Sequence, residues 1–391
     1  MKIGISAPVE CSTFEEYLYD EDRVKSKGLG LGGSQVNQII VELLKRDCKL
    51  SIFTLDKSIK VGGELVLKGK NITVYIGPFR RNKMCAFDFQ RVERKYLEKV
   101  IKEDKPDIVH AHWTYEFALG AINSKIPHLI SVRDWAPAIL KLIPKPYRVM
   151  RLLLNYYVFF KGQNFVANSM YIDKKISNLA RNKFELVANA ISDESFLVKE
   201  KIFNKNNQII ISINNGFGKI KNVSILVKAF SIVLEAMPDV RLILIGKDFE
   251  KNGLANNWAK ENCIEKNIEF IGEVSHKDIL KRLEAVDLLV HPALEESFGN
   301  TLIEAMSKKV PVIGGNNSGA VPWVLDNGEA GILTDITDEI QIANKILCIL
   351  ESEEKWKRYS KCGYSRASEE FKLSTTVDRY LMIYKQIIKG E

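Results

Sequence analysis

The chain has 391 residues and a net charge of +8 at pH 7, and 46% of its residues are hydrophobic and 27% charged. This length suits two or three domains, and this composition excludes an intrinsically disordered chain. Lysine and arginine are spread along the whole chain without a basic arm, so we expect no nucleic-acid partner.

Apolar runs alternate with amphipathic stretches through the first half of the chain. Residues 34–46 and 89–103 are predicted helices, and in the first of them the apolar residues recur at helical spacing. The alternation predicts a Rossmann-like, doubly wound α/β domain over residues 1–198. The apolar runs suit buried parallel strands, and they cover residues 2–6, 50–55, 72–76, 107–110, 128–132 and 165–167.

A second alternating series follows the polar segment 199–207, which is rich in lysine and asparagine and predicts a linker. The series predicts a second doubly wound domain over residues 208–370. We expect the last stretch, 371–391, to form a helix that packs back on the N-terminal domain. The predicted strands of the second series are 209–213, 240–245, 268–271, 288–290 and 310–313, and its predicted helices include 223–236, 277–284, 336–351 and 354–370.

The segment 291–306 lies where an open α/β sheet binds its ligand, beyond the carboxyl end of a predicted strand. A helix is predicted to begin near Asn300, after Phe298 and Gly299, with Asn300 or Thr301 as its cap. The free amides of its first turn and the positive end of its dipole form a site for a diphosphate.

Two glutamates lie on either side of this helix start, Glu296 in the loop and Glu304 one turn into the helix. A carboxylate repels a diphosphate, so we expect both to accept hydrogen bonds from sugar hydroxyls. Taken singly, each also suits a solvated position. Paired glutamates serve glycoside hydrolases as well, and that alternative stays open.

Glu296-x7-Glu304 contains Phe298-Gly299 and is followed by Val310-Pro311-Val312-Ile313, and this pattern resembles the signature of retaining glycosyltransferase family 4. The resemblance covers nearly the entire chain. It implies the GT-B fold, in which two Rossmann-like domains face each other across a cleft. It also implies metal-independent hexosyl transfer from a nucleotide-diphosphate sugar with the anomeric configuration kept. By position, Glu296 resembles the glutamate that holds the donor sugar, and Glu304 resembles the one that binds the ribose.

Lysines between a strand and a helix at 214–222 are predicted to supply the positive charge that a diphosphate leaving group needs. Lys221 matches the lysine of the family. The family pairs that lysine with an arginine, but here the position is Asn214 or Asn215. Lys219 is therefore the candidate for the second charge, and a solvated loop lysine is the alternative.

The first domain carries further candidates by resemblance. Gly32 and Gly33 resemble the Gly-Gly turn of the family near the donor phosphate, and His112 matches a histidine that faces the donor sugar. Arg133 and Asp134 stand where relatives carry His-Asp, and a guanidinium there suits an acidic acceptor.

Two more positions are carried over from the family in the second domain. The turn at 318–322 resembles a Gly-Gly-x-Pro-Glu turn, but Ala320 and Trp323 replace two of its residues, so only Gly319 is carried over. Val274 lies where relatives hold the nucleotide base through backbone atoms.

The predicted mechanism is front-face substitution, because no carboxylate nucleophile stands out in the first domain. Glu296, Lys221 and His112 are the predicted catalytic residues, with no metal and no cofactor besides the donor, which we expect to be a UDP- or GDP-sugar. The expected acceptor is a glycan or lipid-linked glycan of surface polysaccharide synthesis. A non-catalytic binding subunit of the same fold is the alternative. A dinucleotide oxidoreductase is disfavoured, since no Gly-x-Gly-x-x-Gly follows the first strand.

Residues 141–161 mix basic, aliphatic and aromatic side chains. This mixture suits contact with an anionic membrane that carries a lipid-linked sugar, and it suits a buried core helix equally. The chain begins with a strand pattern rather than a signal peptide, and its six cysteines are scattered. We therefore expect a cytoplasmic protein with peripheral contact at the inner face of the cell membrane.

Overall fold

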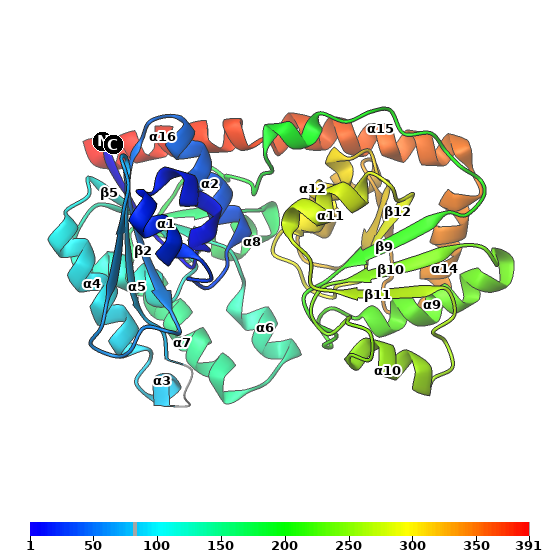
Figure 1. Cartoon of the computed structure of the whole chain (residues 1–391), viewed down its shortest axis with the longest axis horizontal. Coiled ribbons are helices and arrows are strands. Elements are labelled where there is room, and N and C mark those ends of the chain that lie inside the picture. The colour runs from blue at the N-terminus through cyan, green and yellow to red at the C-terminus, as the bar shows by residue number, and fades with distance from the viewer. Residues whose placement is uncertain (81–83, 391) are drawn as a thin grey trace. The chain divides into compact units, whose positions relative to one another are not determined.

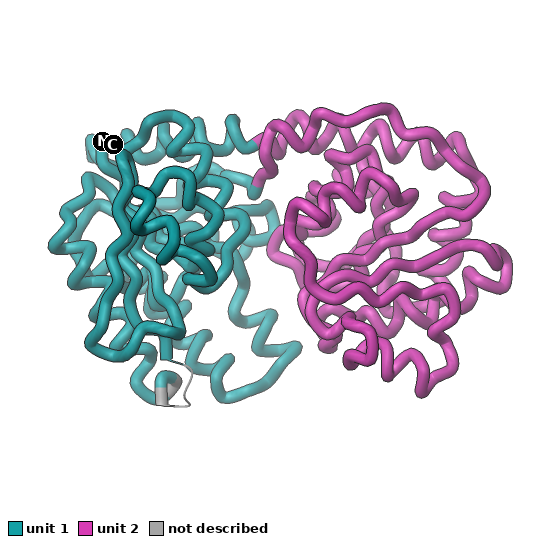
Figure 2. Tube along the Cα trace, viewed as in Figure 1, with its two compact units in different colours: residues 1–189, 373–391 teal, residues 190–372 magenta. Residues whose placement is uncertain are grey.

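The computed structural model describes residues 1–80 and 84–390, and these form two compact units (Figure 2). Unit 1 comprises residues 1–189 and 373–391, and unit 2 comprises residues 190–372. The chain passes into unit 2 directly after Asn189 and returns to unit 1 at Leu373. The polar segment 199–207 therefore lies within unit 2 and does not mark the boundary, because the residues preceding it already pack there.

Unit 1 is built on an eight-stranded sheet with the strand order β3-β4-β2-β1-β5-β6-β7-β8 (Figure 1). Every pairing is parallel except that of β3 with β4. The central strands are buried along almost their whole length, as their continuous apolar runs predict. The strands are β1 (Lys2–Ser6), β2 (Lys49–Asp56), β3 (Leu65–Lys68), β4 (Ile72–Pro78), β5 (Ile108–His112), β6 (His128–Val132), β7 (Asn164–Ala167) and β8 (Asn182–Lys183).

The helices of unit 1 include the last helix of the chain, α16. Arg46, which directly follows α2, forms an ion pair with Asp378 of α16 at 2.5 Å and donates a hydrogen bond to the carbonyl oxygen of Ser374 at 3.0 Å. The C-terminal residues of the chain are thereby held against its N-terminal part. The helices are η1 (Cys11–Tyr17), α1 (Asp20–Ser26), α2 (Ser34–Lys45), α3 (Met84–Phe87), α4 (Arg91–Asp104), α5 (Glu116–Ser124), α6 (Ala136–Leu142), α7 (Pro146–Lys161), α8 (Met170–Ile176) and α16 (Leu373–Lys389).

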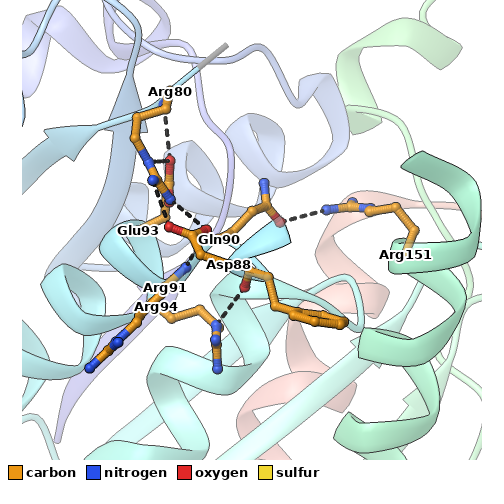
Figure 3. A network of polar contacts seen from close by, with 8 residues as sticks. Arg80, Asp88, Gln90, Arg91, Glu93, Arg94 and Arg151 are labelled. Atoms are coloured by element: carbon orange, nitrogen blue, oxygen red, sulfur yellow. Dashed lines mark hydrogen bonds and ion pairs between the residues drawn. The ribbon is translucent and has the colours of Figure 1, made fainter. Parts of the chain in front are cut away.

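A polar network connects α4 to α7 (Figure 3). Arg80 forms ion pairs with Asp88 and with the fully buried Glu93, each at 2.7 Å. Beside it, Arg151 of α7 donates a hydrogen bond to the side-chain oxygen of Gln90 at 3.4 Å. This hydrogen bond is the contact between the network and α7.

Helix α7 has two different faces. The buried face belongs to the core of unit 1, as the core-helix alternative requires, and comprises Met150, Leu154, Asn155, Val158 and Phe159. The opposite face exposes large apolar side chains at helical spacing, namely Val149, Leu153, Tyr156, Tyr157 and Phe160. One face of α7 is therefore the buried core helix that the sequence allows, and the other face is uncovered within the described residues.

Unit 2 is built on a six-stranded, fully parallel sheet with the strand order β11-β10-β9-β12-β13-β14. Its strands are β9 (Ile209–Ile213), β10 (Arg241–Ile245), β11 (Ile268–Gly272), β12 (Leu288–His291), β13 (Val312–Gly315) and β14 (Ile332–Thr334). Its helices are η2 (Asp193–Phe196), α9 (Val223–Ala236), α10 (Leu254–Glu261), α11 (His276–Leu283), α12 (Asn300–Ser307), α13 (Val321–Val324), η3 (Asp326–Gly328), α14 (Glu339–Leu350) and α15 (Glu353–Glu370).

Both units have the Rossmann-like α/β architecture that the alternating pattern predicts, so the predicted fold class is confirmed. The sequence reasoning missed β3, β8 and β14, which have between two and four residues each. In the described part of the chain, no helix is both long enough and apolar enough to cross a membrane.

Candidate functional site

Unit 2 contains a cavity of about 340 Å³ at the carboxyl ends of β9, β10 and β12, next to the start of α12. This is the edge of a parallel sheet at which such folds bind ligands. Among the residues predicted for the site, Lys221, Val274, Glu296, Gly299, Asn300 and Thr301 line the cavity. The remaining lining residues are Ile213, Asn214, Asn215, Ile245, Gly246, Lys247, Glu273, Ile279 and His291.

Helix α12 begins at Asn300, as predicted, but its N-cap is Gly299 and not Asn300 or Thr301, so the predicted cap is wrong. Gly299 has no side chain that could cap the helix, and Gly299, Asn300 and Thr301 all line the cavity. The first turn and the positive end of the helix dipole therefore border the cavity. This arrangement suits an anionic group such as a phosphate.

Glu296 lies beside two basic side chains at the cavity. Lys221 donates a hydrogen bond to Oε1 of Glu296, and Nε2 of His291 lies 3.3 Å from the same oxygen. Burial alone would raise the pKa of Glu296, but His291 and Lys221 outweigh it and lower this pKa to about 2. The carboxylate is therefore ionised at neutral pH and acts as a hydrogen-bond acceptor.

His291 is a site residue that the sequence reasoning did not single out. It is the last residue of β12, and Oγ1 of Thr301 lies 3.3 Å from its Nδ1. The available signal was its place at the carboxyl end of a buried strand, directly before the loop that carries Glu296.

Glu304 is buried on α12, where its Oε1 forms a hydrogen bond with Nε2 of His276 at 3.0 Å. This hydrogen bond raises the pKa of His276. Neither residue lines the cavity, but Ile279 of the same helix as His276 does, so the pair lies beside the cavity. No sequence spacing indicates His276, which precedes Glu304 by 28 residues.

Lys219 does not line the cavity, and its side chain is exposed to solvent. The second lysine at the cavity is Lys247, two residues after the end of β10, and the sequence reasoning missed it. Lys247 reaches the cavity because the carboxyl ends of β9 and β10 are neighbours in the sheet, although they are distant in sequence.

Phe298 and Gly319 shape the loop of Glu296 and do not line the cavity. Phe298 is buried against the rings of Trp323 and Phe371. Gly319 allows a close approach, because a Cβ atom there would lie 2.2 Å from the carbonyl oxygen of Glu296. The amide of Ala320 donates a hydrogen bond to that same oxygen at 2.8 Å.

The remaining candidates lie in unit 1. Gly33 is the N-cap of α2 with φ +110°, and a Cβ atom there would lie 2.3 Å from the carbonyl oxygen of Pro8. Gly32 precedes it, also at positive φ. The Gly-Gly turn thus starts a helix that no side chain caps.

His112 is the last residue of β5, and Arg133 directly follows β6. Arg133, which is predicted to face an acidic acceptor, lies in buried surroundings. It is only 6% exposed, and its guanidinium donates hydrogen bonds to His112 and Asn189. Asp134 accepts a hydrogen bond from the Tyr115 hydroxyl at 2.9 Å, and burial raises the pKa of Asp134.

Comparison with known proteins finds two family models that match consecutive parts of the chain. Residues 32–195 match the model "Glycosyltransferase Family 4", and residues 193–366 match the model "Glycosyl transferases group 1".

Curated relatives include an N-acetyl-alpha-D-glucosaminyl L-malate synthase of Bacillus anthracis, 29% identical over 199 residues. That match spans about half of each protein, 51% in both cases. The capsular polysaccharide biosynthesis glycosyltransferase CapM of Staphylococcus aureus is 25% identical over 334 residues, which cover 82% of this chain and 86% of CapM.

Similar solved structures include a sucrose-phosphate synthase from Thermosynechococcus elongatus, with a TM-score of 0.79, 15% identity and full coverage of both chains. Anabaena HepE in complex with UDP has a TM-score of 0.69 at 16% identity, covering 99% of this chain and 100% of HepE. At these identities the likeness shows the fold.

Proposed function

Because this chain belongs to glycosyltransferase family 4 and has the GT-B fold, we propose that it moves a sugar from a nucleotide diphosphate to a hydroxyl of an acceptor, with the anomeric configuration kept. The observation that carries the proposal is the cavity of unit 2. There the start of α12, Lys221 and Glu296 lie together at the carboxyl edge of the sheet.

In the proposed complex, the pyrophosphate lies against the first turn of α12. Lys221 and Lys247, which both line the cavity, supply positive charge without a metal ion. Glu296 is ionised and accepts hydrogen bonds from hydroxyls of the donor sugar. Glu304, oriented by His276, accepts hydrogen bonds from the ribose.

The proposed chemistry is front-face substitution at the anomeric carbon of the donor. The bond from this carbon to the pyrophosphate oxygen breaks, and the bond to the acceptor oxygen forms on the same face of the sugar. The departing phosphate oxygen takes the proton of the acceptor hydroxyl. The contribution of the protein is then positioning and stabilisation of the negative charge that develops on the pyrophosphate.

Relatives support the choice of substrates. CapM takes part in capsular polysaccharide biosynthesis, and HepE has been solved with UDP-glucose. We therefore propose a UDP- or GDP-sugar as donor and a glycan or lipid-linked glycan as acceptor.

The exposed face of α7 supports a membrane as the location of that acceptor. Leu153 and Phe160 are 52% and 64% exposed on one helix face. Lys145 and Lys161 lie at the two ends of this helix, and Lys141 lies on the preceding helix, α6. Apolar side chains with basic neighbours match the acyl and anionic layers of a bilayer surface. We propose that this face rests on an anionic membrane.

Vesicle binding tests the membrane proposal. The variant Leu153→Ser/Phe160→Ser should lose about tenfold or more in affinity for phosphatidylglycerol vesicles, because two apolar side chains no longer leave water. Met382→Ser on α16 is the matched control, since Met382 is 64% exposed in the same unit, and it should bind as the wild type does. Equal binding to neutral phosphatidylcholine vesicles would contradict the proposal, as would a dimer in solution held together by this face.

A panel of nucleotide sugars tests the proposed reaction. We expect UDP- or GDP-sugars to raise the melting temperature of the protein, since a ligand that binds the native state stabilises it. We also expect slow release of free sugar from the same donor. Binding without any release or transfer would favour a non-catalytic subunit, and cleavage of glycosides without a nucleotide would favour a hydrolase.

A further inference from the structure

Arg133 is a buried cation without a carboxylate partner among the described residues. Its side chain is 6% exposed, and its two hydrogen bonds run from Nε to Nδ1 of His112 at 2.9 Å and from Nη1 to Oδ1 of Asn189 at 2.6 Å. A buried charge normally requires an opposite charge or a full set of hydrogen bonds. Arg133 has two neutral acceptors instead, and its hydrogen bonds fix the orientation of both side chains, His112 and Asn189.

The bond to His112 determines which nitrogen of the ring carries the proton. A guanidinium has only donors, so Nδ1 of His112 must accept. The proton of the neutral imidazole is then on Nε2. In the described residues Nε2 is buried and has no hydrogen-bond partner, so its N–H is a donor without an acceptor there.

We propose that Arg133 is a positioning residue that holds His112 as the Nε2–H tautomer and thereby makes it a hydrogen-bond donor, rather than a base, toward a substrate oxygen. The part that concerns the substrate rests on the proposed glycosyl transfer. The part that concerns the tautomer does not, because it follows from the geometry alone.

The neighbours of His112 support a neutral ring. His110, two residues earlier on β5, lies with its ring centroid 4.0 Å from that of His112, and it forms hydrogen bonds with Tyr384 and Ser131. Burial, His110 and Arg133 together lower the pKa of His112 well below its usual range. The other titratable groups near Arg133 are the hydroxyls of Tyr380 and Tyr384 on α16, and no carboxylate faces the pair within the described residues. The ring therefore stays uncharged through the neutral range.

Nitrogen NMR of the full chain with 15N-labelled histidine tests the tautomer directly. Long-range spectra distinguish a protonated from an unprotonated ring nitrogen, and the loss of one signal set in His112→Ala assigns His112 among the five histidines. We expect Nδ1 unprotonated and Nε2 protonated from about pH 5.5 to pH 8.5, since a buried histidine can have its pKa lowered by several units. A protonated Nδ1 in the wild type would overturn the proposal.

The variant Arg133→Met removes the donor while keeping a long side chain. We expect His112 to exchange between its two neutral tautomers, while burial still holds its pKa below the usual range. Arg133→Lys, which can still donate to Nδ1, should keep part of the wild-type spectrum. Arg46→Met is the control, because Arg46 binds α16 by an ion pair away from His112. A wild-type His112 spectrum in Arg133→Met would refute the positioning role.

A double-mutant cycle tests the consequence for the reaction. We expect Arg133→Met to lower kcat/KM about tenfold, the usual effect of misaligning one hydrogen bond to a substrate. Arg133→Met/His112→Ala should be no worse than His112→Ala alone, because Arg133 acts through His112. Additive losses would show an independent structural role and overturn the proposal. If the wild type transfers no sugar, the proposed function fails, while the NMR result still decides the tautomer.

Discussion

Lys221 in unit 2 and Arg133 in unit 1 both follow the carboxyl side of a parallel strand, but their surroundings differ. Lys221 is partly exposed at a cavity, where it pairs with the ionised Glu296. Arg133 is buried and bonded to the neutral His112 and Asn189.

The difference shows that a cation after a strand of a Rossmann-like unit can have one of two roles, depending on its burial. A lysine at the edge of a cavity, balanced by a carboxylate, can take a second anionic partner there at little desolvation cost. A buried guanidinium without an anion keeps fixed geometry instead, since any movement would leave a charge unsatisfied. In the proposed function, unit 2 thus presents the charge of Lys221 to a ligand, and unit 1 uses the charge of Arg133 to orient His112.

Among the variants proposed here, removal of Lys221, the cation paired with Glu296, should lower the catalytic efficiency most. Lys221→Ala should lower kcat/KM by about a hundredfold to a thousandfold, the range seen when a group that stabilises transition-state charge is lost. Initial rates with the best donor measure it. Lys219→Ala is the matched control, because Lys219 is an exposed lysine two residues away, and it should stay within about twofold of wild type. Equal losses in both variants would remove the distinction between a cavity lysine and a loop lysine.

Removal of the anion in the same pair should have the next largest effect. Glu296→Gln keeps the shape of the side chain but not its charge, so it weakens the hydrogen bonds to the sugar and leaves Lys221 unbalanced. We expect kcat/KM to fall about tenfold to a hundredfold, mainly through kcat. A variant with wild-type rates would show that the reaction requires the negative charge of Glu296 neither for the sugar nor to balance Lys221.

Replacement of His276, the residue that orients Glu304, should change the kinetics less. His276→Asn removes the hydrogen bond to Glu304 and should raise the KM for the donor about threefold while kcat is unchanged, as expected for one modest hydrogen bond. Steady-state kinetics with donor varied at saturating acceptor measure it. A change in kcat alone would place Glu304 with the reacting atoms instead of the nucleotide.

The buried histidines of unit 1 and Glu296 of unit 2 should also affect the stability of the protein in different pH ranges. The pKa values of His110 and His112 are lowered from 6.5, so the unfolded chain binds protons that the folded chain does not, and stability falls as pH drops below about 6.5. The pKa of Glu296 is lowered from 4.5 to about 2, so its contribution is complete above about pH 4.5 and is lost as pH falls toward 2.

Thermal melts of the wild type, His112→Ala and Glu296→Gln between pH 3 and 8 check this separation. His112→Ala should reduce the loss of stability between about pH 6.5 and 5, by a few degrees in melting temperature. Glu296→Gln should differ most from the wild type above about pH 4.5 and converge with it in stronger acid. If the melting temperatures of all three proteins changed with pH in parallel, the lowered pKa values of both His112 and Glu296 would be contradicted.

The local patterns of the sequence were sufficient for most elements and for the helix start of the site. The predicted strands 2–6, 128–132 and 209–213 coincide with β1, β6 and β9, and α12 begins at Asn300 as predicted. These features depend on the spacing of apolar residues and, at the start of α12, on the left-handed turn that Gly299 allows, both of which act over a few neighbouring residues. The shortest strands were missed because two to four residues carry too little of a pattern.

Partnerships across the chain were decided only by the tertiary structure. Glu296 meets Lys221 from 75 residues away, Arg133 meets Asn189 from 56, and His276 meets Glu304 from 28. Lys247 replaces Lys219 at the cavity because neighbouring strands bring their carboxyl ends together. A sequence alone determines which groups are available, whereas packing of the sheet determines which of them share a low-dielectric surrounding and so which pKa values and tautomers they adopt.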